Sequence, residues 1–229
     1  MPKCASTSSG TGRKLLLKLT GLDVAIGTVQ VLRSISLEVP TGAMAGLIGR
    51  NGAGKTTLMR SIMGLLAPAA GGVEFDGNNL VAMPTHSRTS LGIGYMPEDR
   101  RLIPQLSVEE NLLLPAWAVG IADPAARLAS IYEHIPELRQ FRASKALQLS
   151  GGQQKLVALG RAMMAGTRLL LLDEPFEGVA PALAQRLADV IARLKSEGLS
   201  VILSESDFQH SARLVDRVFT IDRGVLSAS

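Results

Sequence analysis

Two kinds of hydrophobic pattern mark the strands of this chain. Apolar and polar residues partly alternate over residues 14–24 and 29–39, and a Pro-Thr-Gly turn at 40–42 closes the second segment. Such alternation predicts two antiparallel strands at an edge of the fold. The runs at 43–48 and 169–172 are apolar throughout, which is typical of strands buried on both faces. We predict further strands at residues 73–75, 91–96, 199–203 and 218–221.

Helical patterns separate these strands and indicate an α/β fold. They cover residues 55–65, about 150–165 and 181–197, and Gly198 ends the last of them. Strands that alternate with helices along a chain form a parallel sheet with right-handed crossovers. We therefore expect a mainly parallel sheet core with an antiparallel β edge.

A helical insertion is predicted in the middle of the chain. Residues 107–110, Ser-Val-Glu-Glu, form a capping box, and a helical pattern runs from there to residue 146. We expect interruptions of this pattern at Pro115, Pro124 and Pro136, because proline breaks helices. The segment is the candidate for a helical subdomain inserted between strands.

Composition and charge describe one globular domain. The 229 residues are 46% hydrophobic and 19% charged, which excludes disorder of the whole chain. We expect a flexible tail at 1–13 and a single domain at 14–229, with its core at about 14–98 and 166–229 and its helical subdomain at about 99–165. The net charge of +4 comes without a long basic run interleaved with aromatic residues, so we expect no nucleic-acid partner. The lone Cys4 and the lack of a bilayer-spanning apolar run predict a cytoplasmic protein.

The segment between the predicted strand at 43–48 and the helix at 55–65 matches a phosphate-binding loop. Its residues are Gly49, Arg50, Asn51, Gly52, Ala53, Gly54, Lys55 and Thr56, followed by Thr57. Glycines let backbone N–H groups curl around phosphates, the start of the helix is positive, and Lys55 adds a cation for the β and γ phosphates. The Thr56 hydroxyl is placed to bind Mg²⁺. A chance glycine turn is the other interpretation, and the strand before the loop and the helix after it argue against that.

Two carboxylates end the apolar run at 169–172. Asp173 and Glu174 would lie at the carboxyl edge of the sheet, where ligands bind in open α/β folds. We predict that Asp173 holds Mg²⁺ and that Glu174 polarises the attacking water. A solvated strand end would explain the two carboxylates if they stood alone. Because a phosphate-binding loop with Lys55 comes earlier in the chain, we interpret them as the partner that binds the metal.

A third motif precedes the helical pattern at 150–165. In Leu-Ser-Gly-Gly-Gln-Gln at 149–154, a serine caps the helix and two glycines admit a close ligand at its positive end. With the loop at Lys55 and the LLLLDEP segment, this motif resembles the ABC ATPase family from about residue 14 onward. The resemblance implies a P-loop NTPase (RecA-like) fold and the cofactors ATP and Mg²⁺. It also implies a head-to-tail dimer in which one subunit contacts the partner's ATP through Ser150, Gly151, Gly152 and Gln153.

Three further segments resemble the ATPase subunits of bacterial importers of the branched-chain amino acid type, including urea and short-amide relatives. They are residues 92–98, 106–112 and 173–181. The resemblance implies that Glu98, where most ABC ATPases have glutamine, ligates Mg²⁺ or the attacking water and senses the membrane subunit. It implies as partners the membrane permease subunits, a second ATPase subunit that is identical or a paralogue, and indirectly a periplasmic solute-binding protein. The chain would then lie on the inner face of the cell membrane, with Trp117 in the core of the helical lobe or in a groove for a permease helix.

Two positions depart from the family pattern. Ile26 stands near the place of an aromatic residue that stacks on adenine, so it can cover the base only by apolar contact. Ser206 stands at the place of the switch histidine, and it can donate one hydrogen bond but carries no charge. His210, which we expect on a helix, is a weak substitute, because such histidines are more often surface or packing residues. We expect hydrolysis that is slow and that requires Glu174.

These features favour an ATP-hydrolysing importer subunit for branched-chain amino acids or a related small polar solute. A nucleotide-binding regulatory module with weak hydrolysis is the alternative that Ile26 and Ser206 suggest, although the complete set of Lys55, Asp173 and Glu174 argues against it. Non-transport ABC ATPases are a further alternative. They usually carry two cassettes or long coiled-coil insertions, and this sequence has neither.

Overall fold

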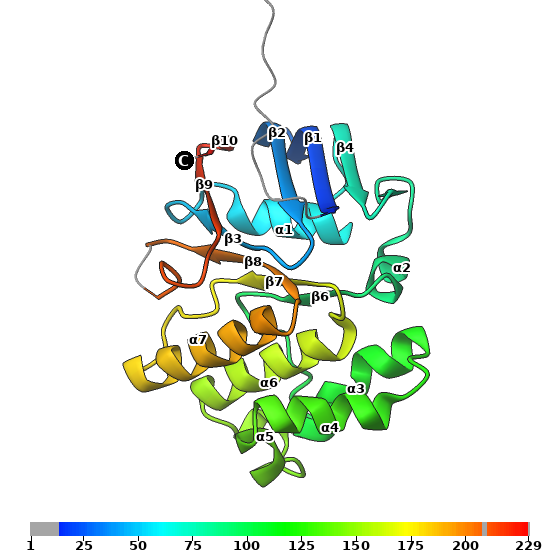
Figure 1. Ribbon diagram of the computed structural model, residues 1–229, viewed down its shortest axis with the longest axis vertical. Coiled ribbons are helices and arrows are strands. Elements are labelled where there is room, and N and C mark those ends of the chain that lie inside the picture. Colours follow the sequence, from blue (N-terminus) through cyan, green and yellow to red (C-terminus); the bar gives the residue numbers. More distant parts are fainter. Residues whose placement is uncertain (1–13, 208–209, 229) are drawn as a thin grey trace, which may run out of the picture.

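A six-stranded sheet crosses the middle of the protein (Figure 1), in the order β10-β9-β3-β8-β7-β6. The computed structural model describes residues 14–207 and 210–228, so the tail predicted at 1–13 lies outside the described residues. The strands are β3 (Met44–Ile48), β6 (Ile93–Met96), β7 (Leu169–Asp173), β8 (Ser200–Glu205), β9 (Arg217–Asp222) and β10 (Val225–Ala228). Only the β9–β10 pair is antiparallel within this sheet of described residues, which confirms the predicted mainly parallel core.

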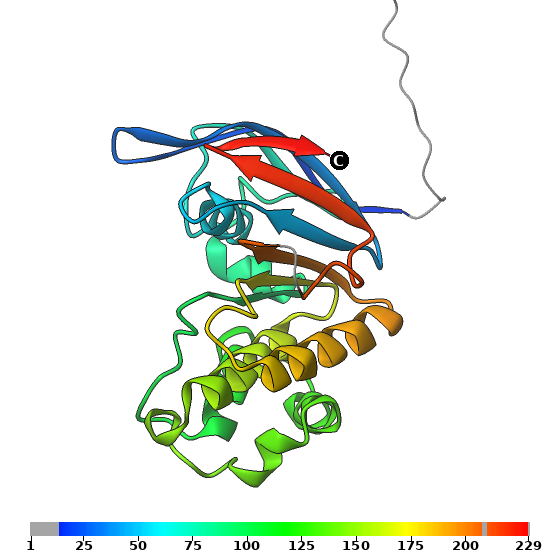
Figure 2. The ribbon, with the colours of Figure 1, turned by 90° about the vertical axis from the view of Figure 1, so that its left-hand side faces the viewer.

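The predicted antiparallel strands form a sheet of their own, in the order β2-β1-β4-β5. They are β1 (Leu15–Ile26), β2 (Val29–Pro40), β4 (Ala70–Phe75) and β5 (Asn78–Asn79). Alternation is clearest in β2, where Ile35, Leu37 and Val39 are buried and the residues between them are exposed. The buried face packs on α1 (Lys55–Met63), which lies between the two sheets (Figure 2).

Side chains of the parallel strands point alternately into two cores, which explains why these strands are apolar throughout. Leu169 and Leu171 of β7 pack in the core that contains α1 and the antiparallel sheet. Leu170 and Leu172 pack in the other core, with α6 (Gly151–Ala165) and α7 (Pro181–Ser196). These two helices cover the second face of the sheet (Figure 2).

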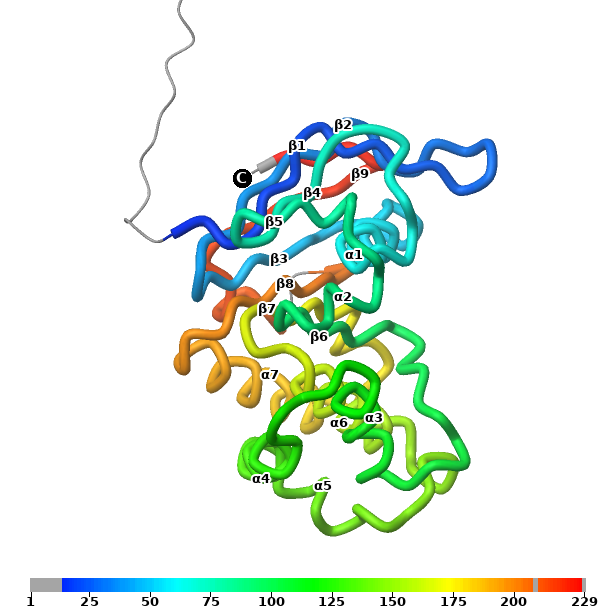
Figure 3. Tube along the Cα trace, turned by 90° about the vertical axis from the view of Figure 1, so that its right-hand side faces the viewer, coloured from blue at the N-terminus to red at the C-terminus, as the bar shows by residue number. Residues whose placement is uncertain are grey.

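Four α-helices and a short 3-10 helix (Ala146–Gln148) lie between β6 and β7 along the chain and contribute to the lower lobe in Figure 3. The α-helices are α3 (Val108–Val119), α4 (Pro124–His134), α5 (Glu137–Gln140) and α6. Pro124 begins α4 and Pro136 precedes α5, but the interruption predicted at Pro115 is wrong, because this residue lies inside α3. Leu112 and Ala116 on either side of it are buried in the core shared with α6, which offsets a proline cost of about 3 kcal/mol.

Two short elements have no signal in the sequence. The helix α2 (Thr85–Ser90) is polar along its length and is held by buried Arg88, which donates to the carbonyl oxygens of Ser61 and Ile62 in α1. The strand β10 covers only four residues after a turn. Trp117 is 58% exposed, so its expected place in the core of the helical lobe is wrong and the groove remains the other prediction.

Candidate nucleotide-binding site

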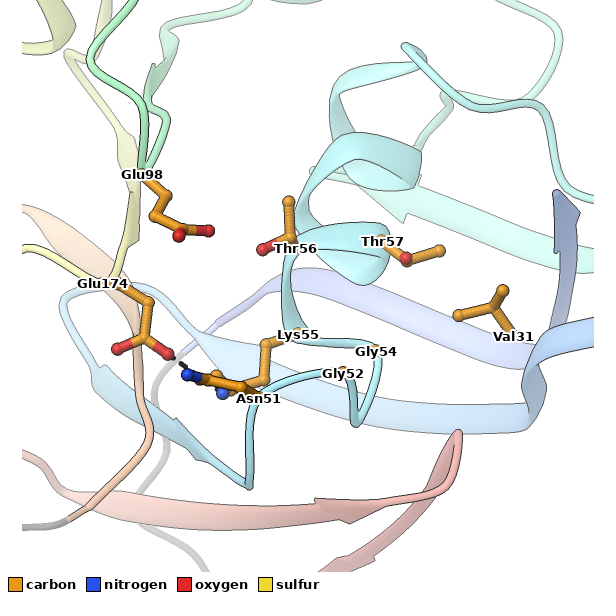
Figure 4. A pocket seen from close by; sticks show the side chains of 9 residues that line it. All are labelled: Val31, Asn51, Gly52, Gly54, Lys55, Thr56, Thr57, Glu98 and Glu174. Atoms are coloured by element: carbon orange, nitrogen blue, oxygen red, sulfur yellow. Dashed lines mark ion pairs between the residues drawn. The ribbon is translucent and has the colours of Figure 1, made fainter.

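The loop after β3 leads directly into α1 and borders a cavity of about 310 Å³. Figure 4 shows that the side chains around this cavity converge from β2, the loop, α1 and the segments after β6 and β7. The lining residues are Val31, Asn51, Gly52, Gly54, Lys55, Thr56, Thr57, Glu98 and Glu174. The structure thus gathers most of the predicted phosphate-binding loop with Glu98 and Glu174.

Glycine is required at two positions of the loop. A Cβ at Gly49 would lie 2.3 Å from the carbonyl oxygen of Ile221, and one at Gly54 would lie 2.8 Å from a methyl carbon of Leu32. Gly54 also has a φ of 115°, which side chains rarely allow. Within the described residues no side chain caps α1 at this position, so the N–H groups of its first turn remain available to phosphate oxygens.

Lys55 extends from the first turn of α1 across the loop to the end of β7. Its Nζ lies 2.9 Å from Glu174 Oε1 (dashed in Figure 4) and 3.2 Å from the carbonyl oxygen of Arg50, and it also donates to the carbonyl of Gly49. Lys55 and Glu174 are both buried. The predicted phosphate-binding cation and the predicted water-activating carboxylate are therefore direct neighbours.

Asp173 ends β7 in a fully buried position, with hydroxyl groups around its carboxylate. Ser204 Oγ donates to Oδ1 over 2.8 Å, Tyr95 OH donates to Oδ2 over 3.2 Å, and the Thr56 side chain also hydrogen-bonds to it. Burial raises the pKa of Asp173, and these hydrogen bonds oppose the rise. A carboxylate beside the Thr56 hydroxyl is an oxygen donor set that fits Mg²⁺ together with phosphate oxygens and water.

Glu174 has an unusual backbone and a hydroxyl partner on the next strand. Its φ is 49°, in the left-handed region, and its N–H donates to Ser204 Oγ over 3.0 Å. Ser206, just after β8, lies 2.9 Å from Glu174 Oε1 and 2.7 Å from Asn51 Oδ1. A hydroxyl has one proton, so Ser206 donates to one of these oxygens at a time. The predicted switch position thus links the phosphate-binding loop to the water-activating carboxylate.

Glu98 follows β6, and its carboxylate points toward Thr56 across the cavity (Figure 4). Glu98 is exposed, but partial desolvation at the cavity raises its pKa, and the negative charges of Glu177 and Asp173 raise it further. No group of three or more His, Cys, Asp or Glu side chains within the described residues is placed to hold a metal ion by itself, so the contribution of Glu98 to a Mg²⁺ site stays a prediction.

Two predicted parts of the ATP site do not line this cavity. Ile26 is 49% exposed at the end of β1, and Val31 of β2 is the apolar residue at the cavity. Val31 has no signal in the sequence, because it is one of many apolar residues in an alternating strand. Ser150 caps α6 through a capping box with Gln153, and neither they nor Gly151 and Gly152 between them line the cavity. The roles of Ile26 and of this loop stay predictions.

A second cavity, of about 240 Å³, adjoins the first at Asn51 and Glu174. It is lined by Asn51, Glu174, Phe176, Glu177, Glu205, Ser206, Asp207 and His210. Burial raises the pKa of the Glu205 carboxyl to about 7, against hydrogen bonds from Ser211. His210 packs on Phe176 with ring centroids 5.3 Å apart. His210 lies in a bend and in none of the helices of the described residues, so the helix expected there is wrong.

A phosphate-binding loop between a buried strand and a helix, faced by an acidic pair at the end of another strand of the same sheet, defines a P-loop nucleotide-hydrolysing domain. The family model described as ABC transporter matches residues 32–177, which is more than half of the chain. The chain therefore belongs to the ABC transporter ATP-binding family, and it is an ATPase.

Relatives of known name cover most of the chain. It is 34% identical over 209 residues to the high-affinity branched-chain amino acid transport ATP-binding protein BraG of Pseudomonas aeruginosa, covering 91% of this chain and 90% of the relative. The probable branched-chain amino acid transport ATP-binding protein LivF of Archaeoglobus fulgidus is 30% identical, with 91% and 89% covered. The lipopolysaccharide export system ATP-binding protein LptB of Escherichia coli is 31% identical, with 87% and 83% covered.

Solved structures share the fold. A nucleotide-free ATP-binding cassette from an ABC transporter matches with a TM-score of 0.81 at 26% identity, covering 94% of this chain and 91% of that one. A dimeric ATP-binding cassette in a post-hydrolysis state, bound to ADP and Pi, matches with a TM-score of 0.82 at 23% identity, covering 93% and 98%. These matches confirm the predicted P-loop NTPase fold.

Proposed function

We propose that this chain is the ATP-hydrolysing subunit of an importer for branched-chain amino acids or a related small polar solute. The observation that carries the hydrolytic part is the contact of Lys55 with Glu174 at the end of the phosphate-binding loop. The importer part is supported by the relatives BraG and LivF, whose names place them in branched-chain amino acid transport. The LptB relatives make export the competing outcome of the test.

Nucleotide binding changes the partners of Lys55. The β and γ phosphates enter the loop, accept hydrogen bonds from the N–H groups at the start of α1, and take the ammonium from Glu174. Thr56 and Asp173, with Glu98 across the cavity, would hold Mg²⁺, which neutralises charge on the phosphates when bound. Entry of the phosphates thereby releases the Glu174 carboxylate.

Hydrolysis then uses Glu174 as the general base. The hydrogen bond from Ser206 falls on Oε1 and does not depend on Lys55, so we assign Oε2 as the oxygen that accepts the proton. The water oxygen attacks the γ-phosphorus as its proton passes to Glu174, and the bond to the oxygen bridging the β and γ phosphates breaks. ADP and inorganic phosphate are the products.

A second ATPase subunit, identical or paralogous, completes each site in this proposal. The N-terminus of α6 at Ser150 and the two glycines after it line no part of the chain's own phosphate cavity. In a head-to-tail dimer these residues and Gln153 reach the γ-phosphate that the partner holds. The site is then finished only when two chains close around two ATP molecules.

Coupling to transport is assigned to exposed apolar residues that follow Glu98 in the chain. Large apolar residues are exposed at Ile103, Trp117 and Leu147, after β6 and in the helical lobe. In this proposal a helix of a permease subunit packs against these exposed apolar side chains. No helix within the described residues is both long and apolar enough to cross a bilayer. The chain would act from the inner face of the cell membrane, and a periplasmic solute-binding protein would act on it only through the permease.

The test is purification of the tagged chain with its membrane partners, followed by ATP turnover in proteoliposomes. We expect co-purified permease subunits, and turnover that a solute-binding protein loaded with a branched-chain amino acid stimulates. The same assembly with Glu174→Gln serves as the inactive control. If lipid-export components co-purify and no amino acid tested changes the rate of ATP turnover, the proposed function in import is wrong and export takes its place. Purified chain that binds ATP without turnover would favour the regulatory module.

A further inference from the structure

A buried lysine in α6 contacts the turn that follows Glu174. Lys155 is 6% exposed, and its Nζ lies 2.8 Å from the carbonyl oxygen of Glu174 and 3.3 Å from that of Pro175. It also donates to the carbonyl oxygen of Glu177. An ammonium group has three protons, so these three carbonyls use its full donor capacity.

The turn held by Lys155 is where the backbone is strained. The left-handed φ of Glu174 is rare for a residue with a side chain, and such strain persists only where the surroundings enforce it. The N–H of Glu174 is bonded to Ser204 Oγ of β8, and its C=O is bonded to Lys155 of α6. Hydrogen bonds to β8 and α6 therefore hold the N–H and the C=O of Glu174, on either side of its Cα.

Burial would ordinarily select against a lysine at this position. Burial lowers the pKa of Lys155, and the negative charge of Glu177 makes the largest contribution that raises this pKa. An apolar side chain would fill the same space without this cost, but it would leave the carbonyl groups of Pro175 and Glu177 unpaired and Glu174 with only its bond from the Glu177 N–H. The arrangement is thus built to fix the main chain of residues 174–177.

We propose that Lys155 is a positioning residue for hydrolysis, which fixes the main chain of Glu174 so that its carboxylate faces the γ-phosphate position. Lys155 lines neither cavity, so it has no direct contact with nucleotide or water in this assignment. Its loss therefore lowers the rate of the chemical step and leaves ATP binding in place. A misplacement of about 1 Å in a catalytic group costs on the order of 100-fold in rate.

The experiment measures kcat and KM for Mg-ATP in Lys155→Met, Lys155→Arg and the control Lys145→Met, which removes an exposed lysine of the same lobe. We expect kcat of Lys155→Met to fall about 100-fold with KM within about threefold of wild type. Lys155→Arg keeps cationic N–H donors and should recover at least about tenfold of that loss. The control should match wild type, and ATP binding by calorimetry should be unchanged in all variants.

Three outcomes would overturn the assignment. They are a kcat for Lys155→Met within about threefold of wild type, a loss expressed only in KM, and an arginine variant no better than the methionine variant. Thermal unfolding shows whether Lys155→Met is folded at the assay temperature. If it is not, Lys155→Gln, which keeps two N–H donors without charge, carries the test with the same criteria.

Discussion

Replacement of Glu205 by glutamine should abolish the contribution of this one side chain to the pH dependence of the free energy of unfolding. Glu205 is 4% exposed at the end of β8, where Ser211 donates to it, and burial raises its pKa from 4.5 to about 7. Glutamine has nearly the shape of the protonated carboxyl and cannot ionise. The substitution therefore isolates the cost of charging this buried side chain.

The direction and size of the change in the free energy of unfolding follow from the pKa values of Glu205 in the unfolded and folded chains. Between pH 4.5 and pH 7 the unfolded chain releases the Glu205 proton and the folded chain keeps it, so the free energy of unfolding of the wild type falls as pH rises. A difference of about 2.5 pKa units corresponds to about 3 kcal/mol. Most of this, about 2 to 3 kcal/mol, falls between pH 5 and pH 8. The Glu205→Gln variant lacks this loss and should gain on the wild type by that amount.

Urea unfolding at pH 5 and pH 8, with EDTA and without nucleotide, measures the effect. The free energy of unfolding of Glu205→Gln minus that of the wild type should rise with pH, while the control Glu74→Gln, at an exposed glutamate, should show no such rise. A difference that stays constant to within about 0.5 kcal/mol would refute the reasoning, because it would mean that Glu205 ionises alike in both states.

Two further predictions concern the ATP site. Ile26→Tyr restores a ring that can stack on adenine, which is worth about 0.5 to 1.5 kcal/mol, so calorimetry should show ATP bound about 2- to 12-fold more tightly. Equal affinities would remove Ile26 from the site. Ser206→Ala removes a hydrogen bond to a charged carboxylate, worth about 1.5 to 3 kcal/mol, and kcat should fall by about 10- to 100-fold with KM nearly unchanged. Unaltered kcat would leave the switch position without a role in hydrolysis.

The sequence predicts those parts of the site that one short segment supplies. The phosphate-binding loop can be predicted because its glycines and Lys55 lie within one short segment. Gly49 and Gly54 must be glycines, because a Cβ there would lie too close to Ile221 or Leu32. Asp173 and Glu174 can be predicted because an apolar strand ends at them, and the carboxyl ends of parallel strands lie at the same edge of the sheet. The order of residues within one segment, together with the rule for the ends of parallel strands, is sufficient to predict these residues.

Residues that reach the site from other elements carry no such signal. Ser204, Tyr95 and Lys155 are single polar residues in or near apolar stretches, and only the packing of β8, β6 and α6 brings them to Asp173 and Glu174. Val31 takes the apolar place at the cavity because of the register of β2, which no local pattern marks.

Errors in the predicted elements have the same origin. Pro115 is tolerated inside α3 because tertiary burial on both sides of it outweighs a local preference. The polar helix α2 forms because Arg88 satisfies the carbonyl groups at the end of α1. Each outcome depends on a partner distant in the chain, which propensity alone does not contain.

The central claim is that Glu174 is the base of an ATPase formed by two chains. It is tested most directly by Mg-ATP turnover and light scattering of the Glu174→Gln protein beside wild type. We predict turnover at least about 100-fold below wild type, with ATP still bound and a dimer accumulating on addition of ATP. A Glu174→Gln protein that hydrolyses ATP at the wild-type rate would contradict the account.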